Sequence, residues 1–179
     1  GMGRDNSNLL ADIIQYLDKP VLVDADGLYH VKKLLNDSQK RKSTIILTPH
    51  YGEMAMLTDR SVSEVKQAPF HISRQFAKKH DLYVVLKGKN TIITAPNGDQ
   101  IVSDRGNAGL AKGGTGDVLS GILLTMLMQH DHIMEALGNG CYIHGKSAEL
   151  LVKHKFHTEN DMLATDVIEG LALVFRTLS

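Results

Sequence analysis

A glycine-rich stretch past the middle of the chain carries the residues best suited to chemistry. Residues 107–117 read Asn-Ala-Gly-Leu-Ala-Lys-Gly-Gly-Thr-Gly-Asp, and an apolar helical pattern starts directly afterwards at Val118. Glycines let backbone N–H groups point inward, and such groups at the positive end of a helix dipole bind anions. Asp117 lies in the first turn of that helix, where it is either a capping acid or a general base beside a transferred phosphate.

The stretch does not match two common nucleotide-binding motifs. It is not a Walker A loop, because Gly109 to Gly114 is followed by Thr115 where that motif needs lysine. It is not the dinucleotide fingerprint either, because no third glycine stands at the required spacing. The motif therefore predicts an anion site without naming the anion.

Three further polar segments follow apolar runs directly: residues 24–27, 48–53 and 87–91. In an open α/β sheet, ligands bind outside the carboxyl ends of the strands. Any one of these segments could be an ordinary loop, but four at one sheet edge favour a site. Residues 87–91, Lys-Gly-Lys-Asn-Thr, supply a cation and a tight turn that suit a nucleotide phosphate, while a solvated strand-end lysine is the alternative.

The elements that position these segments follow from the hydrophobic pattern. Unbroken apolar runs predict buried parallel strands, and the Asn97-Gly98 pair between two strand-like runs predicts a hairpin. Helices are expected after a cap at Asn6 or Ser7 and after a capping box at Ser61–Glu64. The expected strands are 21–23, 44–48, 83–87, 91–95 and 100–103, and the expected helices include 9–17, 28–35, 69–80 and a tail from 118 onwards. This order predicts one α/β domain over residues 1–179, with a mostly parallel sheet.

Composition excludes several classes of protein. The 179 residues carry 20 Lys and Arg against 20 Asp and Glu, which argues against a nucleic-acid binder. No apolar run approaches the roughly 20 residues that a membrane span needs. The single cysteine, Cys141, excludes an internal disulfide and indicates a reducing compartment, so we expect a cytoplasmic protein. Cys141 lies in an apolar helical stretch and is expected to be a buried, inert thiol, and the scattered histidines give no zinc site.

With these residues in hand, the chain resembles the ADP/ATP-dependent NAD(P)H-hydrate dehydratases, a branch of the ribokinase-like superfamily. The most specific match is Leu-Thr-Pro-His-Tyr-Gly-Glu at residues 47–53. The other matching segments are residues 21–28, 85–91, 106–121, 144–145 and 165–168. The resemblance covers essentially the whole chain and implies a ribokinase-like three-layer sandwich, with an antiparallel hairpin beside the parallel strands.

The resemblance also implies a reaction and the residues that perform it. ADP or ATP, with Mg²⁺, would phosphorylate the hydroxyl at C6 of hydrated NADH or NADPH (NADHX or NADPHX), and loss of phosphate would restore the double bond. Asp117 would be the catalytic base. By this resemblance His50 and Asp117 bind the hydrate, and Glu53 meets the metal through water. The remaining assignments are an anion hole at Gly114, Thr115 and Gly116 and a nucleotide site at Lys87, Gly88, Lys89, Asn90, Thr91 and Gly116.

The family pattern departs from this chain at its start. Family domains continue further upstream, through a Gly-Pro-Gly-x-Gly loop whose end is similar to Gly3-Arg4-Asp5. We therefore expect the carboxyl-terminal part of the domain, truncated on the amino-terminal side. A bare sheet edge invites pairing with another chain, so we expect a homo-oligomer, by resemblance a tetramer, with little or no dehydratase activity.

Two other functions stay open. A ribokinase-like small-molecule kinase, for example of a hydroxymethylpyrimidine, needs the same Gly-x-Gly-Asp base. Kinases of this type usually place asparagine where His50 stands, so residues 48–53 favour the dehydratase. A non-catalytic remnant that binds nucleotide or serves as an oligomeric scaffold is the third alternative.

Overall fold

The computed structural model describes residues 7–35 and 41–178. The chain divides into two compact units, each with its own packing. The first comprises Gly1–Gly88 and Ile92–Ile101, and the second comprises Lys89–Thr91 and Val102–Ser179. The prediction of one domain over residues 1–179 stays a prediction, and the two units are described separately.

The first unit is built on parallel strands that are followed by a hairpin. The sheet order is β1-β2-β3-β4-β5; β1 pairs with β2 and β2 with β3 in parallel, and β3 pairs with β4 in antiparallel orientation. Its strands are β1 (Val21–Val23), β2 (Ile45–Leu47), β3 (Tyr83–Leu86) and β4 (Thr91–Thr94), followed by β5 (Gln100–Ser103), which runs into the second unit. Its helices are α1 (Ser7–Tyr16), α2 (Asp26–Leu35), α3 (Tyr51–Thr58), α4 (Val62–Gln67) and α5 (Pro69–His80).

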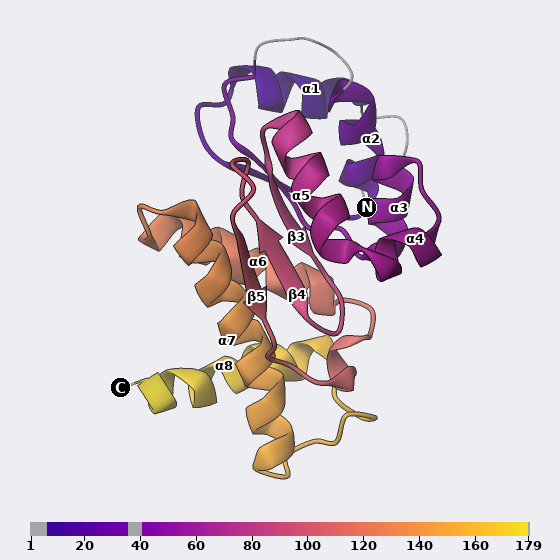
Figure 1. Cartoon of the computed structure of the whole chain (residues 1–179). Coiled ribbons are helices and arrows are strands. Elements are labelled where there is room, and N and C mark those ends of the chain that lie inside the picture. Colours follow the sequence, from indigo (N-terminus) through magenta and orange to yellow (C-terminus); the bar gives the residue numbers. More distant parts are fainter. Residues whose placement is uncertain (1–6, 36–40, 179) are drawn as a thin grey trace. The chain divides into compact units, whose positions relative to one another are not determined.

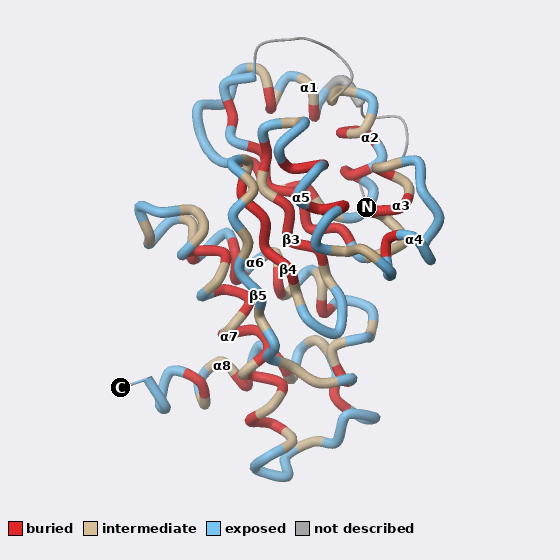
Figure 2. Tube along the Cα trace, viewed as in Figure 1, coloured by how far each residue is buried: buried red, intermediate tan, exposed pale blue. Residues whose placement is uncertain are grey.

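The core of the first unit lies between these helices and the sheet. The three residues of β2 are at most 1% exposed, as expected for a strand that is covered on both faces. Figure 2 shows this buried centre along the strands and the inner sides of the helices. Leu28 of α2, Met54 of α3 and Ala77 of α5 are fully buried in the same cluster.

The second unit is helical. It contains a short 3₁₀ turn, η1 (Ala108–Leu110), and the helices α6 (Thr115–Gln129), α7 (Ile133–Lys153) and α8 (Ala164–Leu178). The long helix α7 packs against both α6 and α8. Gly140 permits the contact with α6, because a Cβ there would lie 2.7 Å from a methyl group of Leu123.

The structure confirms most of the expected elements. The α/β class, the strands, the hairpin and helix 69–80 are present, and Gly98 takes a positive φ of 95° in the hairpin turn. The Ser61 box is also formed, with the Glu64 N–H donating to the Ser61 hydroxyl and the Ser61 N–H to the Glu64 carboxylate. Asn6 and the polar turn at residues 36–40 lie outside the described residues. Over the described ranges, no helix combines the length and apolar character needed to cross a membrane.

Two helices differ from expectation. The sequence pattern predicted no helix over residues 51–58, where α3 lies, and it predicted that the helix after the glycine-rich loop starts at Val118. The structure begins that helix, α6, at Thr115, because the Thr-Gly-Asp residues already take helical geometry behind Gly114. Asp117 is nevertheless in the first turn, as predicted.

Candidate active site

Asp24 and Lys87 meet at the carboxyl ends of β1 and β3. The Lys87 ammonium donates to Asp24 Oδ1 at 2.9 Å, and the two side chains are only 22% and 16% exposed. The Lys87 N–H donates to the Pro49 carbonyl at 2.8 Å, within an isolated parallel bridge between His50 and Lys87 beyond the ends of β2 and β3. The positive charge of Lys87, a predicted nucleotide-binding residue, is therefore paired with the Asp24 carboxylate. Sequence analysis gave Asp24 no role, although it placed residues 24–27 at the same edge.

His50 caps helix α3. Its Nδ1 accepts the N–H groups of Gly52 at 3.0 Å and Glu53 at 3.1 Å, while the Glu53 carboxylate accepts the His50 N–H at 2.7 Å. Because Nδ1 is an acceptor, the ring proton lies on Nε2. The side chain is 60% exposed, so its N–H is available to a ligand. The cap thus fixes both the tautomer and the direction of the predicted substrate-binding residue.

Glu53 is only partly free to meet a metal. One carboxylate oxygen is used in the cap, and the other lies 3.6 Å from His50 Nε2. No group of three metal-ligating side chains is present in the part of the chain that the structure describes. A magnesium ion held by protein oxygens alone does not fit these residues, whereas Mg²⁺ that keeps its waters and is carried by phosphates does fit.

The loop between β3 and β4 is the predicted nucleotide loop. Gly88, Lys89 and Asn90 are exposed, and Thr91 opens β4. Gly88 has a packing reason to be glycine, since a Cβ there would lie 2.6 Å from the Tyr51 hydroxyl oxygen. Tyr51, the first residue of α3, therefore lies directly against Gly88.

The start of α6 is arranged differently from that of α3. Gly114 takes a positive φ of 87° at the N-cap, and no side chain within residues 7–35 and 41–178 caps the helix. Thr115 is 5% exposed, and its hydroxyl donates to the carbonyls of Leu110 at 2.7 Å and Lys112 at 2.8 Å. Its N–H also points to the Lys112 carbonyl, at 3.4 Å. The Thr115 N–H is therefore directed to the loop, and the anion hole at Gly114, Thr115 and Gly116 stays a prediction.

Asp117 is exposed at the third helical position of α6. Its carboxylate makes no hydrogen bond or ion pair with any residue that the structure describes. A capping acid would accept a backbone N–H at the helix start, as Glu53 and Glu64 do. The carboxylate still lies at the positive end of the helix dipole. Its geometry thus suits a base more than a cap.

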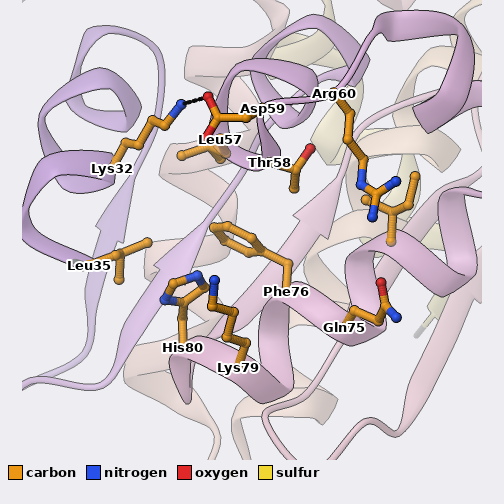
Figure 3. Close-up of a pocket in the computed structure, with 11 residues that line it drawn as sticks. Lys32, Leu35, Leu57, Thr58, Asp59, Arg60, Gln75, Phe76, Lys79 and His80 are labelled. Atoms are coloured by element: carbon orange, nitrogen blue, oxygen red, sulfur yellow. Dashed lines mark hydrogen bonds and ion pairs between the residues drawn. The ribbon is translucent and has the colours of Figure 1, made fainter.

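A separate cavity lies elsewhere in the first unit, between α2, α3 and α5 (Figure 3). It measures about 190 Å³, below the roughly 300–1,000 Å³ of typical small-molecule sites. Its Lys32 ammonium is already bound to Asp59 at 2.5 Å and to the Met56 carbonyl at 2.6 Å. None of the predicted site residues lines this cavity, so it does not belong to the candidate site.

The candidate residues thus fall into two groups. Within the first unit, His50, Glu53, Lys87 and Gly88 lie together around the ends of β2 and β3. Within the second unit, residues 114–117 form the start of α6. The joining of these groups into one site stays a prediction. Cys141 is buried as expected, and its burial raises the pKa of the thiol to about 12.

Comparisons with known proteins agree with the expected family. A sequence model described as NAD(P)H-hydrate dehydratase matches residues 1–172. An ADP-dependent (S)-NAD(P)H-hydrate dehydratase of Bacillus subtilis is 37% identical over 166 residues, which cover 92% of this chain and 57% of the relative. The chain spans about a third of the length of bifunctional NAD(P)H-hydrate repair enzymes that it also matches.

Solved structures give the same result. The crystal structure of an ADP/ATP-dependent NAD(P)H-hydrate dehydratase from B. subtilis, co-crystallised with ATP and Mg²⁺ and soaked with coenzyme A, is similar with a TM-score of 0.85 and 34% identity. The similarity covers 95% of this chain and 60% of that one. A ribokinase-like superfamily protein from Enterococcus faecalis, 23% identical with a TM-score of 0.82 over 99% of this chain and 60% of its own, supports the predicted ribokinase-like fold. The chain therefore belongs to the NAD(P)H-hydrate dehydratase family.

Proposed function

We propose that the protein dehydrates the C6 hydrates of NADH and NADPH in a reaction that consumes ADP or ATP. One observation carries the proposal: Asp117 is exposed and unpaired among the described residues, at a helix start that no described side chain caps. Family membership supports the choice of reaction, since the relative from B. subtilis is named an ADP-dependent dehydratase.

The chemistry begins with a proton transfer. Asp117 takes the proton of the C6 hydroxyl, whose oxygen then bonds to the terminal phosphorus as the bond to the leaving nucleotide breaks. The products of this step are the phosphorylated hydrate and AMP or ADP. Phosphate then leaves with the electrons of the C6–O bond, and a neighbouring ring carbon gives up a proton to restore the double bond. Phosphate is a much better leaving group than hydroxide, which is why nucleotide is consumed.

The other residues bind and orient. The N–H groups of Gly116 and Asp117 stabilise the charge on the transferred phosphoryl group, and residues 87–91 hold the nucleotide. His50 offers its Nε2–H to the hydrate, in the direction that the α3 cap sets. Mg²⁺, when bound with the nucleotide, would neutralise phosphate charge, and Glu53 would meet it through a water.

We extend the proposal to assembly and location. The single cysteine favours a cytoplasmic location, the open end of the sheet favours a homo-oligomer, and the family resemblance favours a tetramer. Strand β5 ends the sheet order, and its Ile101 and Val102 are 42% and 44% exposed. Light scattering at dilute concentration tests the assembly, and a stable monomer would contradict it.

The test of the reaction is an assay of hydrate consumption with and without ADP or ATP, at high enzyme concentration. Consumption is expected to require nucleotide. Asp117→Asn should lower the rate by about 10²–10⁴-fold and keep nucleotide affinity within a few-fold. Asp131→Asn, another exposed aspartate of the same unit, is the control and should change neither.

Two results would contradict the proposal. Near-normal turnover by Asp117→Asn would remove Asp117 from the role of base. A protein that neither binds adenine nucleotide in calorimetry nor consumes the hydrate would exclude the reaction for this chain.

A further inference from the structure

One face of helix α7 holds the loop that leads into α6. His144 and Ala148 lie one helical turn apart, and Gly145 and Glu149 lie beside them, the spacing at which helical residues share a face. The Ala148 carbonyl accepts the Asn107 side-chain amide at 3.0 Å, and Glu149 Oε1 accepts the Gly106 N–H at 3.1 Å. Two neighbouring residues of this helix, Ala148 and Glu149, thus bind a single loop.

The helix approaches the loop closely. A Cβ on Gly145 would lie 2.5 Å from the carbonyl carbon of Arg105, so only glycine permits the two backbones to meet there. The Arg105 guanidinium lies over the Tyr142 ring, 5.8 Å from its centre, and 3.9 Å from the Glu149 carboxylate. Backbone and side chains of Arg105 are therefore both held by α7.

His144 makes the contact nearest to the catalytic end of the loop. Its Nε2 lies 3.1 Å from the Thr115 carbonyl oxygen, and the two residues are 8% and 5% exposed. A carbonyl oxygen can only accept, so His144 Nε2 carries the proton and donates. A donor and an acceptor buried in this way gain more from pairing than they would in water.

Thr115 is the first helical residue of α6, two positions before Asp117. Its hydroxyl is tied to the preceding loop and its carbonyl to His144. Because the side-chain hydroxyl and the backbone carbonyl of Thr115 both have partners, the peptide plane between Thr115 and Gly116 is held in one orientation. That plane sets the direction of the Gly116 N–H and of the turn that carries Asp117.

We propose that His144 is a positioning residue: by holding the Thr115 carbonyl it orients the first turn of α6, and with it the Asp117 carboxylate and the N–H groups of the anion hole. Its effect on turnover rests on the proposed function, whereas its effect on the order of the first turn does not. A misplacement of about 1 Å in a catalytic group can cost about 10²-fold in rate, so a loose first turn is expected to lower kcat.

The experiment compares three variants: one that removes the donor at position 144, one that keeps a donor there, and a control that removes a different buried hydrogen bond of α7. His144→Leu removes the donor and keeps an apolar side chain, and His144→Gln keeps an N–H that can reach a carbonyl. Ser147→Ala is the control on the same helix, because Ser147 is fully buried and its hydroxyl donates to the Val167 carbonyl of α8 at 2.6 Å. Each is measured for kcat, for the nucleotide KM, and for amide hydrogen exchange at Val118, whose N–H bonds the Gly114 carbonyl at 3.1 Å.

We expect His144→Leu to lower kcat by about 10²-fold, to leave the nucleotide KM within a few-fold and to speed exchange at Val118. His144→Gln should restore most of the kcat and slow the exchange at Val118 again, and Ser147→Ala should change neither quantity. If His144→Leu does not fold, His144→Asn takes its place, because its amide is too short to reach Thr115.

Three outcomes would overturn the proposal: unchanged kcat and exchange in the donor-less variant, equal kcat losses in that variant and Ser147→Ala, or no recovery with His144→Gln. If the wild-type protein neither binds adenine nucleotide nor consumes the hydrate, the proposed function fails while the exchange data still decide the role of His144. Faster exchange at Val118 in the donor-less variant alone supports it, and equal exchange in all variants contradicts it.

Discussion

Helices α3 and α6 both start at predicted ligand-binding segments, yet their first turns are built in opposite ways. At α3 the His50 ring accepts two backbone N–H groups, and Glu53 returns the bond to the His50 N–H. At α6 the N-cap is Gly114, and no side chain of the described residues caps the helix. One start is closed by its own side chains, and the other is left open.

The difference shows two ways of making a helix start useful. At α3 two backbone donors are used in fixing the His50 side chain, which stays 60% exposed with its Nε2 3.6 Å from the Glu53 carboxylate. At α6 the backbone donors themselves are offered, and a neighbouring helix fixes them through Thr115. A closed start presents a side chain in one orientation, whereas an open start presents N–H groups to an anion.

The largest expected effect concerns the support of the open start. Gly145→Ala should destabilise the protein by about 1–3 kcal/mol through overpacking, because the new Cβ would meet the Arg105 backbone at 2.5 Å. Gly121→Ala in α6 is the matched control, since a Cβ there meets nothing within 4 Å. It should stabilise by about 0.5–1 kcal/mol, the usual gain from alanine within a helix. Urea denaturation measures both, and equal effects would show that α7 does not support the loop through this contact.

The next effect concerns the closed start. His50→Ala should cost about 0.5–2 kcal/mol, the usual range for losing an N-cap, because the N–H groups of Gly52 and Glu53 lose their acceptor. His50→Asn keeps a capping oxygen and should stay within a few tenths of a kcal/mol of the wild type.

The same pair separates capping from substrate binding. His50→Asn keeps the cap but loses the Nε2–H donor, so turnover should fall while urea denaturation stays unchanged. If His50→Asn loses stability as His50→Ala does, then the ring, and not its acceptor atom, stabilises α3.

The smallest effect concerns a second closed start, that of α4. Donation from the Ser61 hydroxyl, and then from its N–H, lowers the pKa of Glu64 below 4.5. The carboxylate therefore stabilises the fold above pH 4.5, and this contribution is lost as the pH falls through the lowered pKa. Carbon-13 NMR of the Glu64 carboxyl should show the lowered pKa, and Ser61→Ala should raise that pKa toward the ordinary value, because it removes the hydroxyl donor and keeps the backbone N–H. A wild-type titration at 4.5 or above would refute the box as the cause.

Much of the fold could be predicted because its signals are local. Buried strands read as unbroken apolar runs, and Ser61–Glu64 and Asn97-Gly98 are short motifs with a single structural meaning. Helix α3 was missed because its start signal is His50, which is outside the usual set of Ser, Thr, Asp and Asn at an N-cap. The start of α6 was placed three residues late because Thr115-Gly116 continues a glycine-rich run that reads as a loop.

The site could be predicted only in part. The motifs located the segments, but the ion pair of Lys87 with Asp24 joins residues 63 positions apart, and no local pattern encodes it. The same holds for His144, which meets Thr115 from 29 positions away. Such partners are set by how strands and helices pack, so they appear only in three dimensions.

The Lys87–Asp24 pair has a consequence for ionic strength. Because the two charges cancel at close range, a phosphate that approaches from beyond the Debye length, about 10 Å at 0.1 M salt, meets little net field from them. Recognition at this strand end then depends on short-range contacts, and salt should change the association rate little there. Within the proposed nucleotide loop, Lys89 is an exposed cation that added salt can screen, so we expect Lys89→Ala to weaken the salt dependence of polyphosphate association.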